Sequence, residues 1–201
     1  MRYTIPMQTP TSKPRILIYG DSNVWGENFS GARIKYSGRW VNRLSRAMRK
    51  KARVVADGVT GRVAGDFRAD KPQKNGKATF APVLQRTSPD IIIIALGTND
   101  LQQRFNRSAT NIIDDLLFYK KTAKKAHVIY LLPPPFDTGE QSGPEFTEQS
   151  ERVRQELLQA SDKLSDCIEL PHLPLSDGLH FSLRGHRIVS SIVKNVLESY
   201  L

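Results

Sequence analysis

The chain has 201 residues, 39% of them hydrophobic and 25% charged, with a net charge of +10, which is typical of a globular protein long enough to bury one core. No apolar run approaches the roughly 18 residues of a membrane-spanning helix, and the polar segment 1–14 lacks the apolar stretch of a secretory signal. We therefore expect a lead-in over residues 1–14, a single domain over residues 15–201 and a cytoplasmic location.

Strand-like and helix-like segments alternate along the chain. The first half predicts a strand at 15–19, a helix at 39–50, a strand at 53–56, an exposed loop at 71–77, a short helix at 80–86 and a strand at 91–95. The second half predicts a helix from the cap Ser108 to about 124, a strand at 128–132, a helix at 145–164, a strand at 167–170 and a helix at 183–197. This alternation indicates an α/β fold with a mainly parallel sheet, and the four isoleucines Ile91 to Ile94 suit a central strand buried on both faces.

The positive charge is concentrated in two blocks. They consist of Arg43, Arg46, Arg49, Lys50, Lys51 and Arg53, and of Lys120, Lys121, Lys124 and Lys125. Both fall where a predicted helix ends, where cations complement the helix dipole, so we interpret them as solvated helix ends. We expect at most a weak attraction to anionic surfaces and no specific nucleic-acid partner; a binding module that uses these blocks is the alternative. The single cysteine, Cys167, excludes an internal disulfide and is expected to be a small buried residue.

Polar and reactive residues follow the predicted strands, where open parallel sheets bind their ligands. These segments are Gly20-Asp21-Ser22-Asn23, Gly58-Val59-Thr60-Gly61-Arg62, Gly97-Thr98-Asn99-Asp100 and, after the last short strand, Asp177-Gly178-Leu179-His180.

Ser22, His180 and Asp177 are the candidate catalytic residues. A serine hydroxyl needs a base to become a nucleophile, and an imidazole titrates near neutral pH. Asp177 lies three residues before His180 and can fix the tautomer of its ring, which completes a triad. The alternatives are a turn or helix-cap role for Ser22 and a structural or metal-binding role for the Asp-x-x-His pair, although no third ligand stands at a metal-like spacing.

Asn99 and Gly61 are candidate donors to an oxyanion, which acyl transfer has to stabilise. Asn99 offers a side-chain amide after the central strand, and the small Gly61 leaves its backbone N–H accessible. Taken singly, Asn99 also suits a helix cap and Gly61 a simple turn. Their order at successive strand ends favours the catalytic interpretation.

These segments together resemble the SGNH, or GDSL, hydrolase family over nearly the whole chain. Gly20-Asp21-Ser22 with Trp25-Gly26 is similar to its first block, Gly58-x-Thr60-Gly61 to the second, Gly97-Thr98-Asn99-Asp100 to the third and Asp177-x-x-His180 to the last. The sequence is most similar to bacterial arylesterase/acyltransferase-type members. The segments that carry this similarity are Arg39-Trp40, Gly58–Arg62, Leu96–Asp100 and Pro133–Pro135. Ala56 departs from the pattern, because many relatives carry there an asparagine that braces the loops.

The resemblance implies a three-layer α/β/α sandwich with a five-stranded, mainly parallel, flavodoxin-like sheet, and it implies no cofactor. Because no third ligand stands at a metal-like spacing, we also expect no metal. The resemblance also implies that Ser22 is the nucleophile, that Asp177 and His180 are its orienting acid and base, and that Ser22, Gly61 and Asn99 form the oxyanion hole. The expected activity is hydrolysis of a carboxylic ester, of short acyl chain or acetyl type, with acyl transfer as a second activity. A lysophospholipase or thioesterase and a carbohydrate acetylesterase remain alternatives on the same site.

Overall fold

Five parallel strands form one sheet in the computed structural model, which describes residues 12–139 and 142–201. The strand order is β2-β1-β3-β4-β5, and the bounds are Arg15–Gly20 (β1), Arg53–Gly58 (β2), Ile91–Ala95 (β3), His127–Leu131 (β4) and Cys167–Ile168 (β5). Every pair of neighbours is parallel, so the predicted flavodoxin-like sheet is confirmed and is parallel throughout. The predicted lead-in lies almost wholly outside the described residues.

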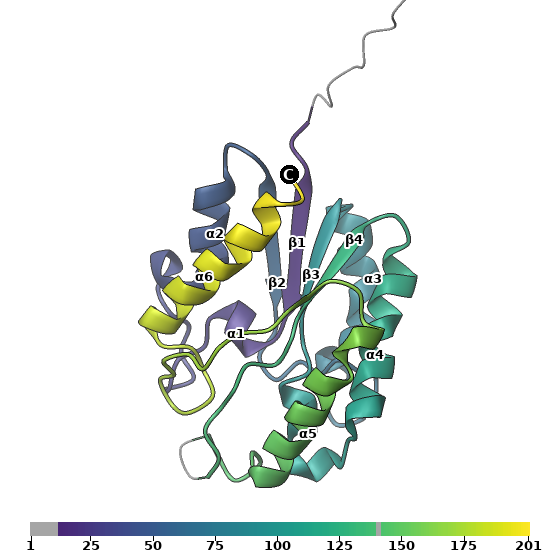
Figure 1. The fold of residues 1–201 in the computed structure, drawn as a ribbon, viewed down its shortest axis with the longest axis vertical. Coiled ribbons are helices and arrows are strands. Elements are labelled where there is room, and N and C mark those ends of the chain that lie inside the picture. Colours follow the sequence, from purple (N-terminus) through teal and green to yellow (C-terminus); the bar gives the residue numbers. More distant parts are fainter. Residues whose placement is uncertain (1–11, 140–141) are drawn as a thin grey trace, which may run out of the picture.

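Helices cover both faces of the sheet, which gives the predicted three layers (Figure 1). One face carries α2 (Trp40–Met48) and α6 (Leu183–Glu198), and the other carries α3 (Gly76–Thr87), α4 (Ala109–Ala123) and α5 (Glu148–Gln159). Alternate residues of β1 enter different cores, because successive side chains of a strand point to opposite faces. Ile16 and Ile18 pack on the α2 side, and Leu17 and Tyr19 pack on the α4 side.

The strand order places the site. In the sheet, β1 lies between β2 and β3, so the chain leaves β1 toward β2 and leaves β3 in the opposite direction, toward β4. The segments that follow these two neighbouring strands therefore separate and leave a crevice at the carboxyl end of the sheet, where α/β proteins bind ligands. A one-turn helix, α1 (Ser22–Trp25), begins directly beyond β1 at this edge.

The prediction of an exposed loop over residues 71–77 is wrong for its later part: Asn75 and Gly76 are buried, and α3 already begins at Gly76. Asn75 exchanges two hydrogen bonds with the backbone of Arg68, of 2.9 and 3.1 Å. Helix α3 starts already at Gly76, four residues before the predicted start. A Cβ at Gly76 would collide with Tyr119 Oη and lie 2.5 Å from the Val63 carbonyl oxygen, so this close approach requires glycine.

Two further predictions are wrong in detail. Helix α5 covers only part of the predicted range 145–164, because Thr147 and Ser150 form a capping box at its start and the chain changes to a 3₁₀ turn at Ser161–Lys163. Cys167 is exposed and not buried, because it belongs to the edge strand β5. Partial desolvation and the nearby Asp166 carboxylate nevertheless raise the pKa of its thiol to about 11.

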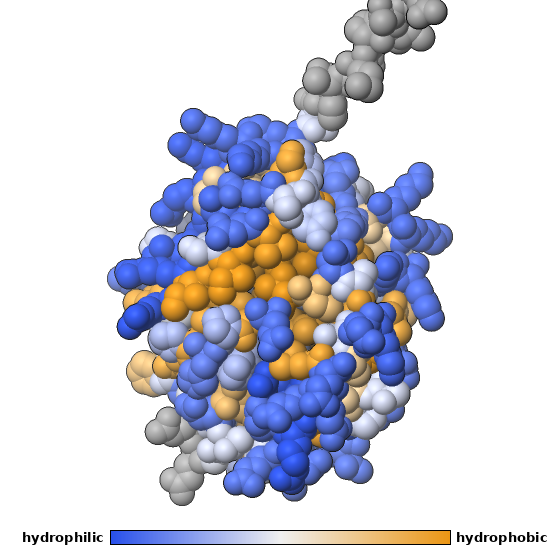
Figure 2. All heavy atoms as spheres, viewed as in Figure 1, coloured by the Kyte–Doolittle hydropathy of each residue, from blue (hydrophilic) through white to orange (hydrophobic). Residues whose placement is uncertain are grey.

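The two basic blocks fall around the carboxyl ends of helices, as predicted: α2 ends at Met48 and α4 ends at Ala123. Figure 2 shows hydrophilic side chains around the rim of one face and an apolar band across its middle. Partly buried apolar residues, among them Leu175, Ile188, Ile192 and Val196, pack onto the core on the α6 side of the sheet. None of the helices in the described part of the chain is long and apolar enough to cross a membrane.

Candidate active site

Ser22 lies at the start of α1, where β1 ends in a tight turn. The preceding Gly20 fits only because it has no side chain: a Cβ there would collide with Val24 Cγ2 and lie 2.6 Å from the Ala95 carbonyl oxygen. The helix is capped by Asp21, whose carboxylate accepts a hydrogen bond of 3.0 Å from the Asn23 backbone N–H. The Ser22 hydroxyl is therefore not used as the cap, which leaves it available for other contacts.

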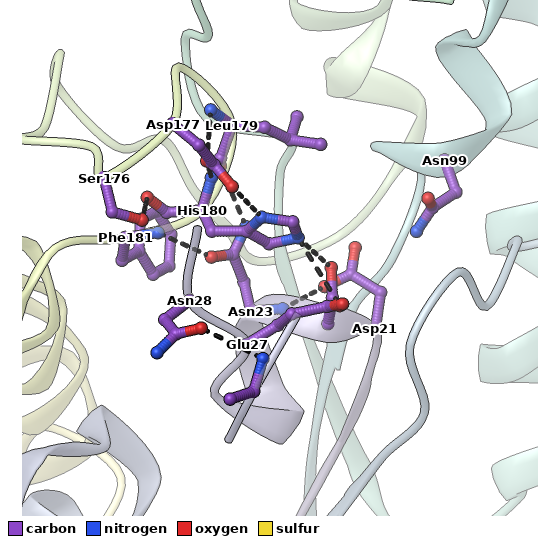
Figure 3. A network of polar contacts seen from close by, with 12 residues as sticks. Asp21, Asn23, Glu27, Asn28, Asn99, Ser176, Asp177, Leu179, His180 and Phe181 are labelled. Atoms are coloured by element: carbon purple, nitrogen blue, oxygen red, sulfur yellow. Dashed lines mark hydrogen bonds and ion pairs between the residues drawn. The ribbon is translucent and has the colours of Figure 1, made fainter. Parts of the chain in front are cut away.

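A chain of hydrogen bonds joins Ser22 to His180 and Asp177 (Figure 3). His180 Nε2 lies 3.0 Å from Ser22 Oγ, and His180 Nδ1 lies 2.7 Å from Asp177 Oδ2. The second carboxylate oxygen of Asp177 accepts the backbone N–H groups of Leu179 and His180, at 3.1 and 2.7 Å. Desolvation raises the pKa of Asp177, but the hydrogen bonds from the ring and backbone of His180 outweigh it, so the pKa is lowered and the carboxylate is ionised at neutral pH.

Asn23 holds the two halves of this arrangement together, a role that the sequence did not reveal. Its side-chain oxygen accepts the Phe181 backbone N–H at 3.0 Å, and its amide nitrogen donates to the Leu179 carbonyl at 3.4 Å. Its own carbonyl accepts the indole N–H of Trp40 at 3.0 Å. The loop that carries His180 is thereby fixed to α1, although Asn23 and Phe181 are 158 residues apart in the chain.

Glu27 is a second carboxylate beside the imidazole, and it was also missed. Its Oε2 atom lies 3.6 Å from His180 Nε2, the ring nitrogen that does not contact Asp177 (Figure 3). The residue stands just beyond α1, and its backbone N–H donates to the Ser22 carbonyl at 3.0 Å. Nothing in the local sequence distinguishes Glu27 from a surface glutamate, because its closeness to His180 comes from the fold.

Two backbone N–H groups, of Ser22 and Gly61, are candidate anion donors. Gly61 has a φ of +70°, a left-handed conformation that suits glycine. Within residues 12–139 and 142–201, neither N–H donates to an acceptor in the protein. Gly61 does form part of a turn, since Arg62 N–H donates to the Val59 carbonyl at 3.1 Å, so the turn and the free donor occur together.

Asn99 is buried and is held in one orientation. Its amide nitrogen donates to the Arg62 carbonyl at 3.1 Å, and its oxygen accepts Gln102 Nε2 at 3.0 Å. One N–H of the amide is left over in the described part of the chain, and Figure 3 shows the amide across from the His180 ring. Asn99 is not a helix cap: Thr98 precedes the 3₁₀ turn Asn99–Leu101, and no side chain caps that turn.

Arg62 joins the loops that follow β1 and β2. Its guanidinium donates to the carbonyls of Gly20 and Asp57, at 3.0 and 2.9 Å, and pairs with the Asp57 carboxylate at 2.7 Å. It also lies 4.0 Å above the ring of Tyr19. Because these contacts join the ends of β1 and β2, Arg62 fixes the position from which its own carbonyl holds Asn99.

The geometry joins Ser22, His180 and Asp177 directly, and it places Gly61 and Asn99 on the segments that follow the neighbouring strands β2 and β3. A model of the GDSL-like lipase/acylhydrolase family matches residues 18–188, which is most of the chain and includes all five residues. The chain belongs to this family. It is therefore an ester-hydrolysing enzyme.

Solved structures similar to this acylhydrolase agree with it in fold. A native aryl esterase from M. smegmatis has a TM-score of 0.82 at 23% identity, over 94% of this chain and 100% of that one. A carbohydrate acetylesterase family member from Sinorhizobium meliloti has a TM-score of 0.77 at 24% identity, over 92% and 98%. A lipase/acylhydrolase from Enterococcus faecalis has a TM-score of 0.74 at 19% identity, over 94% and 97%. No curated protein matches the chain.

The other histidines of the acylhydrolase have partners of their own. His127 faces Asp166 at 3.0 Å and His172 faces Asp137 at 3.7 Å. His186 is buried in α6, where its Nδ1 accepts the Trp40 backbone N–H at 3.3 Å, and burial lowers its pKa to about 4. Within the described ranges, no three His, Cys, Asp or Glu side chains are arranged as metal ligands.

Asp100, next to Asn99, is fully buried, and its Oδ2 accepts a hydrogen bond of 2.8 Å from the Ala64 backbone N–H. Desolvation raises the pKa of this carboxyl from 3.8 to about 7. The folded protein therefore binds this proton more tightly than the unfolded chain does. The stability that results is complete below the unfolded pKa and is lost as the pH rises through the folded value near 7.

We expect Asp100→Asn to gain stability over the parent protein as the pH rises from 4 to 8, by about 2–4 kcal/mol. Asparagine keeps an acceptor for the Ala64 N–H but carries no charge. Urea unfolding of both proteins across this pH range measures the difference in free energy. A difference that stays constant with pH would show that the carboxyl does not titrate as its burial implies.

Proposed function

We propose that the enzyme hydrolyses carboxylic esters through a covalent acyl intermediate on Ser22. The observation that supports this best is the 3.0 Å contact between His180 Nε2 and Ser22 Oγ, with Asp177 on the other ring nitrogen. A hydroxyl with a base in hydrogen-bond reach, and that base held by a third group, is the arrangement of nucleophilic catalysis.

In the first half of the reaction, Ser22 Oγ attacks the ester carbonyl while His180 Nε2 takes the hydroxyl proton. The carbonyl oxygen becomes an oxyanion, which the N–H groups of Ser22 and Gly61 and the free N–H of Asn99 stabilise. Asp177 stabilises the imidazolium that forms. The tetrahedral intermediate then collapses, His180 gives its proton to the leaving alkoxide, and the alcohol departs from acyl-Ser22.

In the second half, water takes the place of the alcohol. His180 removes a proton from the water as it attacks the acyl carbonyl, and the same three donors hold the second oxyanion. Collapse releases the carboxylic acid and returns the proton to Ser22 Oγ. An alcohol that replaces this water gives a new ester, so acyl transfer is a second activity that we propose for the same site.

Short acyl chains suit the space beside the Ser22 turn. A small cavity of about 20 Å³ lies behind the site, lined by the neighbours of Ser22 and Asn99 (Asp21, Asn23 and Thr98 among others) and not by Ser22 itself, so little free space is available on that side. A larger, mostly apolar groove of about 420 Å³ lies between Phe29, Phe181 and Leu183, and Phe181 lines both spaces. The lack of space behind the Ser22 turn favours acetyl esters, and we propose that the groove, which begins one residue beyond His180, receives an aryl or sugar alcohol.

An acyl-chain series tests this proposal. For 4-nitrophenyl esters and purified protein, we expect kcat/KM to fall at least about tenfold from the two-carbon to the eight-carbon acyl group, as steric exclusion of several methylenes predicts. Ser22→Ala protein supplies the background rate. A maximum at eight carbons would mean that the acyl chain enters the large groove and would favour the lysophospholipase or thioesterase alternative.

Three further properties of the enzyme are predictions from its sequence and its relatives. The first is a sugar acetate as natural substrate, proposed by analogy with the carbohydrate acetylesterases from Sinorhizobium meliloti among the similar structures. A weak attraction of the basic blocks to anionic surfaces, without a specific nucleic-acid partner, follows from charge alone. A cytoplasmic location is the third.

A further inference from the structure

Lys74 places an ammonium group directly over Gly61. It ends the 3₁₀ turn Pro72–Lys74, and its backbone is fixed because its carbonyl accepts the Val63 N–H at 3.0 Å. A Cβ added to Gly61 would lie 2.9 Å from Lys74 Nζ and 3.4 Å from its Cδ. The lysine side chain thus fills the space that a side chain at position 61 would occupy, next to one of the proposed oxyanion donors.

The ammonium is not paired with any group in the described part of the chain. Within the described part of the chain, Lys74 makes neither a side-chain hydrogen bond nor an ion pair. The two acidic groups that raise its pKa, Glu27 and Asp70, are engaged elsewhere: Asp70 pairs with Arg68 at 2.7 Å, and Glu27 faces His180. A half-buried charge without a counter-ion is unfavourable, so an anion that reaches this point gains a charge-assisted hydrogen bond.

Positive charges predominate around Lys74. Desolvation lowers the pKa of Lys74, and the like charges of Lys71 and Arg68 lower it further, whereas Glu27 and Asp70 oppose this only in part. The excess of cations around Gly61 favours a negatively charged ligand and disfavours a second cation.

From this geometry we infer that Lys74 forms an anion-binding subsite beside the acyl-transfer site, so that the preferred substrates are esters with a carboxylate a few bonds from the reacting carbonyl. The inference rests on the proposed function, because it names a substrate class for the same site. The oxyanion has three donors already, in Ser22, Gly61 and Asn99. A negatively charged group that lies beside Gly61 is within reach of Lys74 Nζ, which occupies the space of the missing side chain there.

Matched pairs of esters test the subsite. In the first pair the carboxylate is on the acyl side: the anionic ester is mono-4-nitrophenyl succinate and the neutral ester is 4-nitrophenyl methyl succinate. The other pair carries it on the alcohol side, 4-acetoxybenzoate against its methyl ester. For each pair the ratio of kcat/KM for the anionic to the neutral ester is measured, with the rate of Ser22→Ala protein subtracted as background.

We expect Lys74→Gln to lower this ratio about tenfold for at least one pair, as the loss of a charge-assisted hydrogen bond predicts. Lys74→Arg should retain most of the ratio. Lys125→Gln removes the same unit of charge from an exposed position beyond α4 and serves as the control for net charge. The pair that responds shows which side of the ester carries the carboxylate.

Two results would overturn the inference. The first is an unchanged ratio in Lys74→Gln protein, even if kcat/KM falls equally for the anionic and the neutral ester. The ammonium would then act on the oxyanion or only on packing. An equal change in Lys125→Gln protein would reduce the effect to net charge. A parent protein that cleaves neither ester and whose Ser22 resists a fluorophosphonate probe would instead refute the proposed function itself.

Discussion

Replacement of Ser22 by alanine is expected to lower kcat for aryl acetate hydrolysis by roughly 10⁴–10⁶-fold, the range found when a triad serine is removed. The oxygen that attacks the ester and carries the acyl group is then absent. His180 and the oxyanion donors remain, so a small residual rate above that in water should persist. Initial rates with 4-nitrophenyl acetate measure the loss, and mass spectrometry after fluorophosphonate treatment should show no adduct.

The fold should tolerate this change, because Asp21 and not Ser22 caps α1. The thermal unfolding midpoint should therefore stay close to that of the parent protein, which separates a chemical loss from unfolding. Ser30→Ala is a suitable control, since Ser30 is an exposed serine of a nearby loop whose hydroxyl hydrogen-bonds with Asn28. Near-normal activity of Ser22→Ala protein would refute the acyl-serine mechanism.

Replacement of Asp177 by asparagine is expected to lower kcat by about 10³–10⁴-fold, through the wrong tautomer of His180. Asp177 Oδ1 accepts two backbone N–H groups, of Leu179 and His180, and an asparagine keeps its oxygen there. Its NH₂ group then faces His180 Nδ1, which must become an acceptor. The proton moves to Nε2, so the imidazole can no longer take the proton of Ser22.

Glu27 should strengthen this effect, because its carboxylate 3.6 Å from Nε2 is an acceptor for the misplaced proton. The rates should be measured between about pH 6 and 9, since a base other than the imidazole would restore activity at high pH. Asp166→Asn is the matched control. Asp166 also contacts a histidine, since it lies 3.0 Å from His127, but this pair is at the surface, at the start of β4 and away from the site. Equal losses in the two variants would argue against an orienting role for Asp177.

Much of the fold was predictable because its signals are local. The run Ile91–Ala95 predicted the central strand with its observed bounds, since a strand buried on both faces accommodates consecutive β-branched residues. Ser108 predicted the start of α4, where its side chain does accept the Asn111 N–H. The limits of α3 and α5 were not predictable from periodicity, because Gly76 and Thr147 set them through a tertiary close approach and a side-chain cap.

The candidate site was only partly predictable for the same reason. Ser22, Gly61, Asn99, Asp177 and His180 stand in short motifs whose residue types are informative on their own. Other residues act only through where the fold puts them: Asn23 ties two loops, Glu27 flanks the imidazole, and Lys74 covers Gly61. Asn23 stands in the Ser22 motif, but its type does not reveal a partner 158 residues away, while Glu27 and Lys74 stand in segments that look like ordinary surface, and residues 71–77 were expected to be an exposed loop.

The sequence by itself therefore determined which chemical groups the enzyme carries and at which strand ends they stand, beginning with Ser22 after β1. A tight turn needs glycine, a buried strand needs apolar residues, and each of these requirements is met within a few neighbouring positions. The tertiary structure alone decided the distances, such as the 3.0 Å between Ser22 Oγ and His180 Nε2, and the position of the Lys74 ammonium over Gly61. Those depend on contacts between segments that are 13 to 158 residues apart in the chain, which no local pattern encodes.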